Sequence, residues 1–192
     1  MEYFRNTDKS LPAGELTVEL DPLLPDMSAW LAEQYRNAGQ YERAVELAEN
    51  ALDLDPTNGI ALMSLGTTYA QTGDYERALR MTSKIADHPA WGFTHAAVLA
   101  ESGRTQEARD ILESIDKVPR NVISLVLINS ALGEVDEAFH WMEVARESKL
   151  PWYPWFITLA PFMDKVRADP RMRGYAEELG VEDVLDDVLT SL

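Results

Sequence analysis

The first clear pattern in this chain consists of two runs of apolar residues with helical spacing, separated by Gly39. The first predicts a helix over 27–38, with its apolar positions on one side: Met27, Trp30, Leu31 and Tyr35. The second predicts a helix over 41–54, with these residues on its inner face: Ala44, Val45, Leu47, Ala48, Ala51 and Leu52. Gly39 suits the left-handed conformation in which many helices end, and Pro56 stops the second helix. The pattern predicts an antiparallel helical hairpin.

The same pattern returns three more times. Gly39-Gln40-Tyr41-Glu42-Arg43-Ala44 recurs 34 residues later as Gly73-Asp74-Tyr75-Glu76-Arg77-Ala78. Looser copies at spacings of 30 run from Gly103 to Ala108 and from Gly133 to Ala138, and we expect their first helices to be about one turn shorter. The small residues let paired helices approach closely, and one hairpin cannot bury its apolar face without stacked neighbours. The predicted fold class is all-α, an α-solenoid of antiparallel helix hairpins with a helical C-terminal cap.

The repeat spacing predicts three regions. Residues 1–24 form an N-terminal segment that reads as the end of a preceding repeat, because Glu19-Leu20-Asp21-Pro22 echoes Asp53-Leu54-Asp55-Pro56. Residues 25–150 form four hairpins, at about 25–58, 59–88, 89–118 and 119–150. Residues 151–192 form an aromatic corner followed by an acidic cap. A piece of a longer protein and a small free-standing protein both fit this organisation.

The C-terminal region holds two features with more than one interpretation. Pro151-Trp152-Tyr153-Pro154-Trp155-Phe156 contains Pro-x-x-Pro, but we expect a packed corner rather than a polyproline ligand because the aromatic rings need a core. Residues 181–192 place six apolar residues at helical spacing: Val181, Val184, Leu185, Val188, Leu189 and Leu192. This acidic amphipathic helix is expected to cap the stack, with a dimer contact or a groove ligand as alternatives.

Charge and composition exclude several classes of partner. The net charge is −16, with 12 acidic and 4 basic residues over 1–58 and 6 acidic and none basic over 174–192. This balance argues against binding to nucleic-acid phosphates or anionic lipids. The acidic ends serve solubility or meet a basic partner. The longest apolar run, 122–132, is too short to span a bilayer and no signal peptide is visible, so we expect a cytoplasmic protein without membrane insertion.

No pattern predicts catalysis. The chain has no cysteine, which excludes disulfides and thiolate chemistry. His88, His95 and His140 lie in different repeats without metal-ligand spacing, and His95 is expected to be a partly buried core residue. Neither a nucleophile elbow nor a glycine-rich phosphate loop occurs. We therefore predict no catalytic residue, no metal site, no cofactor and no enzyme activity.

These residues resemble the tetratricopeptide repeat. In a 34-residue unit counted from Pro25, the matching positions are Ala32, Tyr35, Gly39, Tyr41, Ala44, Ala51 and Pro56. The second unit matches at Leu65, Gly66, Tyr69, Gly73, Tyr75 and Ala78, with Ile85 where the family prefers Ala. The resemblance implies a protein-binding function, and structural roles for the repeated residues Gly39, Ala44, Gly73, Ala78, Gly103, Ala108, Gly133 and Ala138.

In this family the first helices line a concave groove. Carried over by register, the peptide-groove positions are Trp30, Glu33, Met63, Thr67, Phe93, Ala97, Ile123 and Leu127. The Lys, Arg and Asn residues with which some members clamp a C-terminal carboxylate are missing, and the floor is apolar. An apolar floor of this length should not face water. It is expected to receive a partner's helix or peptide, to be filled by terminal segments of its own or a neighbouring chain, giving a self-associating module and a possible homo-oligomer, or to be narrowed by curvature.

The C-terminal half also resembles one branch of the family. Ala131-Leu132-Gly133-Glu134-Val135-Asp136-Glu137-Ala138-Phe139-His140-Trp141-Met142, Pro151-Trp152 and Val166-Arg167-Ala168-Asp169-Pro170-Arg171-Met172 follow a recurring ending. It is similar to the C-terminal repeats of bacterial CadC-type transcriptional activators and class III adenylate cyclases. Their output domains are absent here, so the likeness implies a bacterial scaffold or sensor module. A periplasmic location is the alternative, if this is part of a membrane-anchored regulator.

Overall fold

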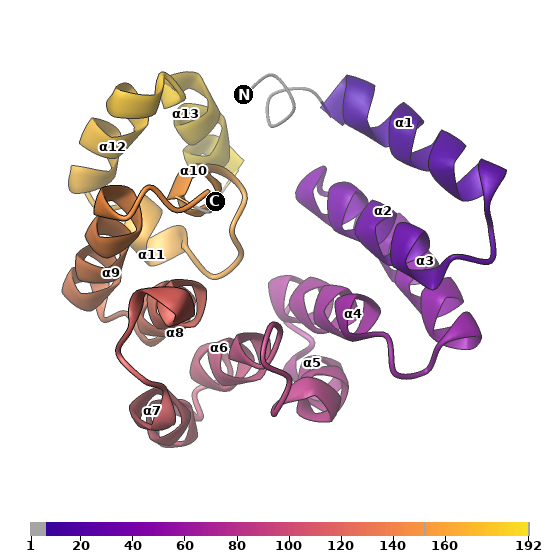
Figure 1. Ribbon diagram of the computed structural model, residues 1–192, viewed down its shortest axis with the longest axis horizontal. Helices are drawn as coiled ribbons and strands as arrows, with labels where there is room; N and C mark the ends of the chain where they lie inside the picture. The colour runs from indigo at the N-terminus through magenta and orange to yellow at the C-terminus, as the bar shows by residue number, and fades with distance from the viewer. Residues whose placement is uncertain (1–6, 152, 192) are drawn as a thin grey trace. The chain divides into compact units, whose positions relative to one another are not determined.

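The computed structural model describes residues 7–151 and 153–191, and in these ranges it holds thirteen α-helices and no strand (Figure 1). Consecutive helices pack as antiparallel hairpins, which confirms the predicted all-α class. The chain divides into two compact units, Met1–Val98 and Leu99–Leu192. Trp152 and Leu192, which the sequence places in the aromatic corner and the cap, lie outside the described residues.

The first unit contains two full hairpins and an N-terminal helix. Its helices are α1 (Thr7–Leu20), α2 (Pro25–Asn37), α3 (Tyr41–Leu54), α4 (Gly59–Gln71), α5 (Tyr75–Thr82), the 3₁₀ turn η2 (Ser83–Ile85) and the start of α6 (Phe93–Glu101). Each of the helices α1 to α4 packs against the next along the chain, and α2 also packs against α4. The predicted helix over 41–54 is α3 without change.

One backbone feature ends the first helix of every hairpin. Gly39, Gly73, Gly103 and Gly133 have φ of 72°, 80°, 87° and 78°, a region that only Gly enters without strain. The N–H of the following residue returns to the carbonyl five residues earlier in each case: Gln40 to Tyr35 (2.9 Å), Asp74 to Tyr69 (2.8 Å), Arg104 to Leu99 (2.9 Å) and Glu134 to Asn129 (2.8 Å). The second helix begins at the next residue.

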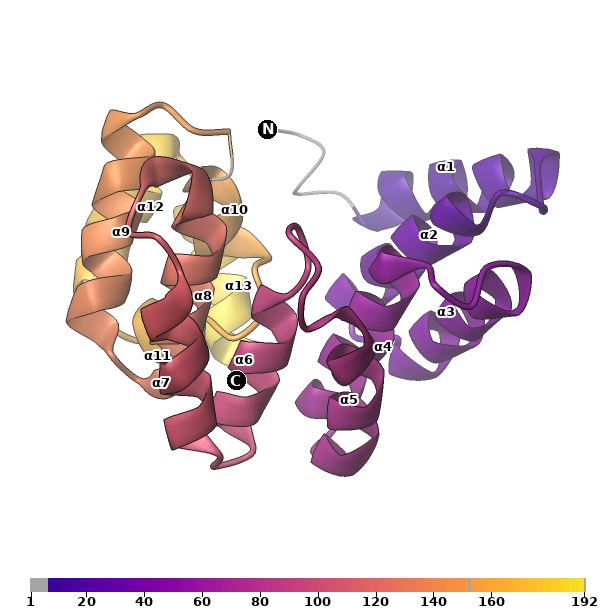
Figure 2. The ribbon, with the colours of Figure 1, turned by 60° about the horizontal axis from the view of Figure 1, so that its bottom comes forward.

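Small residues set the distance between paired helices. Ala78 of α5 is fully buried, and Gly66 belongs to α4, the helix that lies beside α5 (Figure 2). A Cβ at Gly66 would stand 2.2 Å from Thr82 Cγ2, far inside van der Waals contact. The hairpin of α4 and α5 therefore needs a hydrogen atom at position 66 and a methyl group at position 78.

The second unit begins with shortened repeats. Its helices are the end of α6, α7 (Thr105–Ser114), the 3₁₀ turn η3 (Pro119–Asn121), α8 (Val122–Leu132), α9 (Val135–Glu147), α10 (Tyr153–Thr158), α11 (Asp164–Arg167), α12 (Arg171–Leu179) and α13 (Glu182–Ser191). The first helices α6 and α8 have 9 and 11 residues, against 13 in α2 and α4. The expected shortening by about one turn is found in α6, which is four residues shorter, whereas α8 is shorter by only two residues.

A buried arginine organises the C-terminal region. Arg167 is 5% exposed, and its guanidinium donates to the carbonyls of Ile157 (3.1 Å) and Ala160 (2.6 Å) at the end of α10. These bonds satisfy carbonyls that the helix itself leaves without a donor. The side chains of Tyr153 and Phe156 are buried, so the aromatic corner is packed. The amphipathic helix α13 lies on α10, α11 and α12 and buries Leu185.

Replacing Ala78 with Leu should lower the free energy of unfolding by about 1–3 kcal/mol, because the larger side chain overpacks the closest approach of α4 and α5. Urea denaturation measures this change. Ala168, an exposed alanine, is the control, and Ala168→Leu should stay within about 0.5 kcal/mol of the parent. Equal midpoints for the Ala78→Leu variant and the parent would show that position 78 does not lie in this contact.

Candidate functional site

Most of the predicted groove positions of the first unit are buried. Met63 and Thr67 on α4, and Phe93 and Ala97 on α6, are each below 9% exposed. On α2, Trp30 is 44% exposed and Glu33 is partly exposed. The floor of this unit is therefore covered by the chain itself, and Trp30 is its accessible aromatic residue.

The two remaining groove positions belong to the second unit, where both lie on α8. Ile123 is partly exposed, whereas Leu127 is completely buried in the core between α8 and its neighbours. As in the first unit, one groove position stays accessible and another is buried.

An aromatic cluster surrounds Trp30. The Trp91 ring meets the Trp30 ring edge to face, with centroids 6.0 Å apart, and His88 stacks on Trp91 at 6.4 Å. The arrangement suits the quadrupoles of the two indoles. We call Trp30, Trp91 and His88 the aromatic cluster. His88 and Trp91 lie in the connection between η2 and α6, where the sequence pattern gave no sign of a shared site.

Local geometry fixes the position of Trp91. His88 Nδ1 accepts hydrogen bonds from the backbone N–H groups of Ala90 (3.1 Å) and Trp91 (3.2 Å). The indole then lies over Gly59, the first residue of α4, where a Cβ would be 2.8 Å from Trp91 Cδ1. Gly59 leaves the space that the indole occupies. The glycine at position 59 is therefore the feature of the sequence that could have indicated the contact between Trp91 and α4.

A polar network holds Glu33. Arg36 is 3% exposed and donates from Nε and Nη2 to the two carboxylate oxygens of Glu33, both at 3.0 Å. It also donates to Gln71 of α4 (3.2 Å) and to Asn37 (2.7 Å). Because the Glu33 carboxylate already accepts this paired contact, its charge is largely compensated. Glu33 therefore lies at the rim of the groove face as part of an ion pair and not as a free anion.

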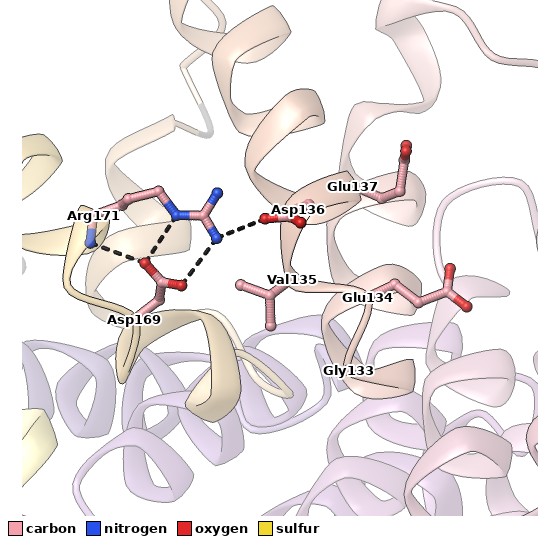
Figure 3. Close-up of a pocket in the computed structure, with 7 residues that line it drawn as sticks. All are labelled: Gly133, Glu134, Val135, Asp136, Glu137, Asp169 and Arg171. Atoms are coloured by element: carbon pink, nitrogen blue, oxygen red, sulfur yellow. Dashed lines mark hydrogen bonds and ion pairs between the residues drawn. The ribbon is translucent and has the colours of Figure 1, made fainter.

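The second unit has an open hollow of about 440 Å³, lined by residues 133–137, Asp169 and Arg171 (Figure 3). Arg171 pairs with Asp136 at 2.8 Å and with Asp169 at 2.9 Å. Hydrogen bonds from the Arg171 side chain and backbone lower the pKa of Asp169 to about 2. Arg171 and its two carboxylate partners thus form an ion-pair cluster in the hollow.

His95 and His140 each have their own local contacts. His95 is partly buried and its Nδ1 lies 3.0 Å from the hydroxyl of Thr82, and His140 is exposed beside Trp141. Within residues 7–151 and 153–191, no three His, Cys, Asp or Glu side chains are grouped as metal ligands. In the same part of the chain no helix is long and apolar enough to cross a membrane.

Comparison with known families identifies the repeat. Two family models, both described as tetratricopeptide repeat, match residues 35–89 and 93–114. The predicted repeat type is confirmed for these stretches, which carry three of the four Gly and Ala pairs: Gly39 with Ala44, Gly73 with Ala78, and Gly103 with Ala108. No curated protein sequence matches the chain. Repeats of this type generally mediate protein–protein interaction and are typically non-catalytic.

Replacing Gly59 with Ala should displace the Trp91 indole and separate it from Trp30, because the new methyl group would overlap Cδ1. We expect weaker near-ultraviolet circular dichroism with unchanged far-ultraviolet helicity. Gly174, in α12, has no neighbouring side chain within 4 Å of the place that a methyl group would take, and it is the matched control. Gly174→Ala should leave the aromatic signal unchanged and stabilise by up to about 1 kcal/mol. An unaltered near-ultraviolet spectrum for Gly59→Ala would contradict the packing described.

Proposed function

We propose that this chain is a non-catalytic protein-interaction module that binds a peptide or helix of a partner along the groove face of its first helices. The family matches over 35–89 and 93–114 support protein binding in general. The groove face and the identity of its contact residues are our assignment. It makes Trp30 the main contact of the first unit and Ile123 the accessible apolar position of the second.

The exposed side chain of Trp30 is the observation that carries this proposal. A tryptophan that is 44% exposed leaves a large apolar surface in water, and tryptophan is enriched among the residues that dominate binding energy. The edge-to-face contact with Trp91 holds the Trp30 ring in place before a partner arrives. A ring that is already ordered loses little conformational entropy on binding.

The buried groove positions belong to the core of their own unit. Met63, Thr67, Phe93 and Ala97 are buried in the first unit and Leu127 in the second, which gives their helices a fixed surface. Glu33 forms part of the rim, since its carboxylate, which is paired with Arg36, is still partly exposed. A ligand that places an apolar side chain on Trp30 and a polar group beside Glu33 suits this surface.

Self-association is the second candidate function. In this candidate a terminal segment of the same or a neighbouring chain fills the groove, although Met63, Thr67, Phe93 and Ala97 are already buried within their own unit. An exchange of α13 between copies has less support, since α13 lies on α10, α11 and α12 of its own unit and buries Leu185 there. The module would then assemble through the surface around Trp30 with another copy.

A sensory role in a bacterial regulator is part of the proposal. It is supported by the likeness of residues 131–172 to the endings of CadC-type activators and class III adenylate cyclases. We propose a cytoplasmic location for the free chain, with a periplasmic location if the chain is joined to a membrane anchor.

A photo-crosslinking amino acid at position 30 tests the partner directly. With p-benzoylphenylalanine in place of Trp30, illumination of the native cells should yield a protein adduct of one discrete mass. The same group in place of Asn50, an exposed residue of α3, should yield none. Trp30→Ala should weaken the complex with the captured protein by about 1–4 kcal/mol and leave the melting temperature unchanged.

Other outcomes would decide between the candidates. An adduct of twice the mass of the chain would favour self-association over a separate partner. If no adduct forms and Trp30→Ala lowers the melting temperature, Trp30 belongs to the core, and the binding proposal for this surface is wrong.

A further inference from the structure

The N-terminal helix α1 is a copy of α3 displaced by one repeat. Thr7–Leu20 and Tyr41–Leu54 each contain 14 residues, and both of their bounds differ by 34, the spacing between Gly39 and Gly73. In each case a short turn containing Asp-Pro follows and leads into the next first helix.

The contacts of α1 repeat with the same spacing. The hydroxyl of Tyr35 on α2 donates to Glu15 of α1, and the hydroxyl of Tyr69 on α4 donates to Glu49 of α3 at 3.5 Å. The turns match as well, since Asp21 accepts the N–H of Leu23 at 3.4 Å and Asp55 accepts the N–H of Thr57 at 2.9 Å. Helix α1 therefore packs on α2 as α3 packs on α4.

A second face of α3 has an exposed counterpart on α1. Helix α3 also packs on α2, its own first helix, and there it buries Leu47 and Ala51. The residues 34 positions earlier, Ala13 and Thr17, are exposed. Together with Leu16 and Leu20 they stand at i, i+3, i+4 and i+7, one stripe of a helix. We call Ala13, Leu16, Thr17 and Leu20 the α1 stripe.

The α1 stripe exposes more apolar surface than a solvated helix needs. Leu16 is 54% and Leu20 77% exposed, and Leu23 and Leu24 extend the apolar surface into the following turn. Four of the seven large apolar side chains that are exposed in the described chain thus lie within residues 16–24. Such a concentration is typical of an interaction site.

The charge around the stripe indicates what covers it. Residues 10–32 contain four acidic side chains and no Lys, Arg or His. Two copies of this surface would repel each other, whereas a basic helix would be attracted. We propose that the α1 stripe docks one amphipathic helix of a partner protein, with apolar residues toward Leu16 and Leu20 and Lys or Arg at its flanks. The proposal does not depend on binding at Trp30.

A designed peptide tests this docking. The probe is a fluorescein-labelled peptide with the sequence of residues 25–38 that carries the substitutions Asp26→Lys and Glu33→Lys, so that the apolar side of α2 is kept and its flanks are basic. Fluorescence anisotropy with the full chain should show binding about tenfold tighter than that of the unsubstituted peptide. Raising NaCl from about 0.05 to 0.5 M should remove most of this advantage.

Variants of the chain locate the site. Leu16→Ser combined with Leu20→Ser should weaken binding of the basic peptide by about tenfold or more, because two leucines lose their burial in the complex. Leu54→Ser is the matched control, since Leu54 is the counterpart of Leu20 on α3 and is 45% exposed. It should change the affinity by less than about twofold. Far-ultraviolet circular dichroism should show the same helicity for all three chains.

Three results would overturn the proposal. The first is no binding of the basic peptide to the parent chain. The second is an equal loss of affinity from Leu54→Ser and from the double change at Leu16 and Leu20, or no loss from either. The third is a dimer in analytical ultracentrifugation that dissociates on the double change, because a second copy of this chain would then cover the stripe.

Discussion

The hairpins of this chain depend on one backbone constraint, a left-handed residue directly after each first helix. Positive φ at Gly39, Gly73, Gly103 and Gly133 turns the chain within two residues, and the returning hydrogen bond closes the helix end. An L-residue with a Cβ is destabilised by about 1–2 kcal/mol in this conformation. The glycines therefore fix both where the first helix stops and the direction in which the second helix leaves.

The surfaces proposed for binding follow from this geometry. Since each turn has the same length, residues one repeat apart occupy matching places, and small residues such as Gly66 and Ala78 decide how closely the helices pack. Close packing of α2 with α4 lets a ring on the η2–α6 connection reach Trp30. The same regularity shows that Ala13 and Thr17 on α1 are uncovered, because their counterparts on α3, Leu47 and Ala51, are buried.

The repeat pattern was sufficient to predict the hairpins, and the bounds of α3 agree to the residue. The hairpins could be predicted because glycine and small residues recur at fixed spacing. The aromatic cluster was not predicted, since Trp91 and His88 lie in a connection without periodicity and meet Trp30 only after folding. Burial of Met63 and Phe93 also depends on neighbouring helices, and the register alone places these residues on a face without telling how deeply they are covered. The sequence also does not predict that Arg167 is buried, because its hydrogen-bond acceptors are backbone carbonyls at the end of α10.

The handedness of the glycine turn can be measured by changing chirality alone at Gly73, which is exposed and has no atom within 4 Å of an added L-Cβ. Two variants of the chain are made by peptide ligation, one with L-alanine and one with D-alanine at this position. Each is compared with the parent by urea denaturation. L-alanine should lower the free energy of unfolding by about 1 kcal/mol, because it resists positive φ. D-alanine favours positive φ and should raise it by about 0.4–1 kcal/mol. Equal effects of the two enantiomers would contradict the account.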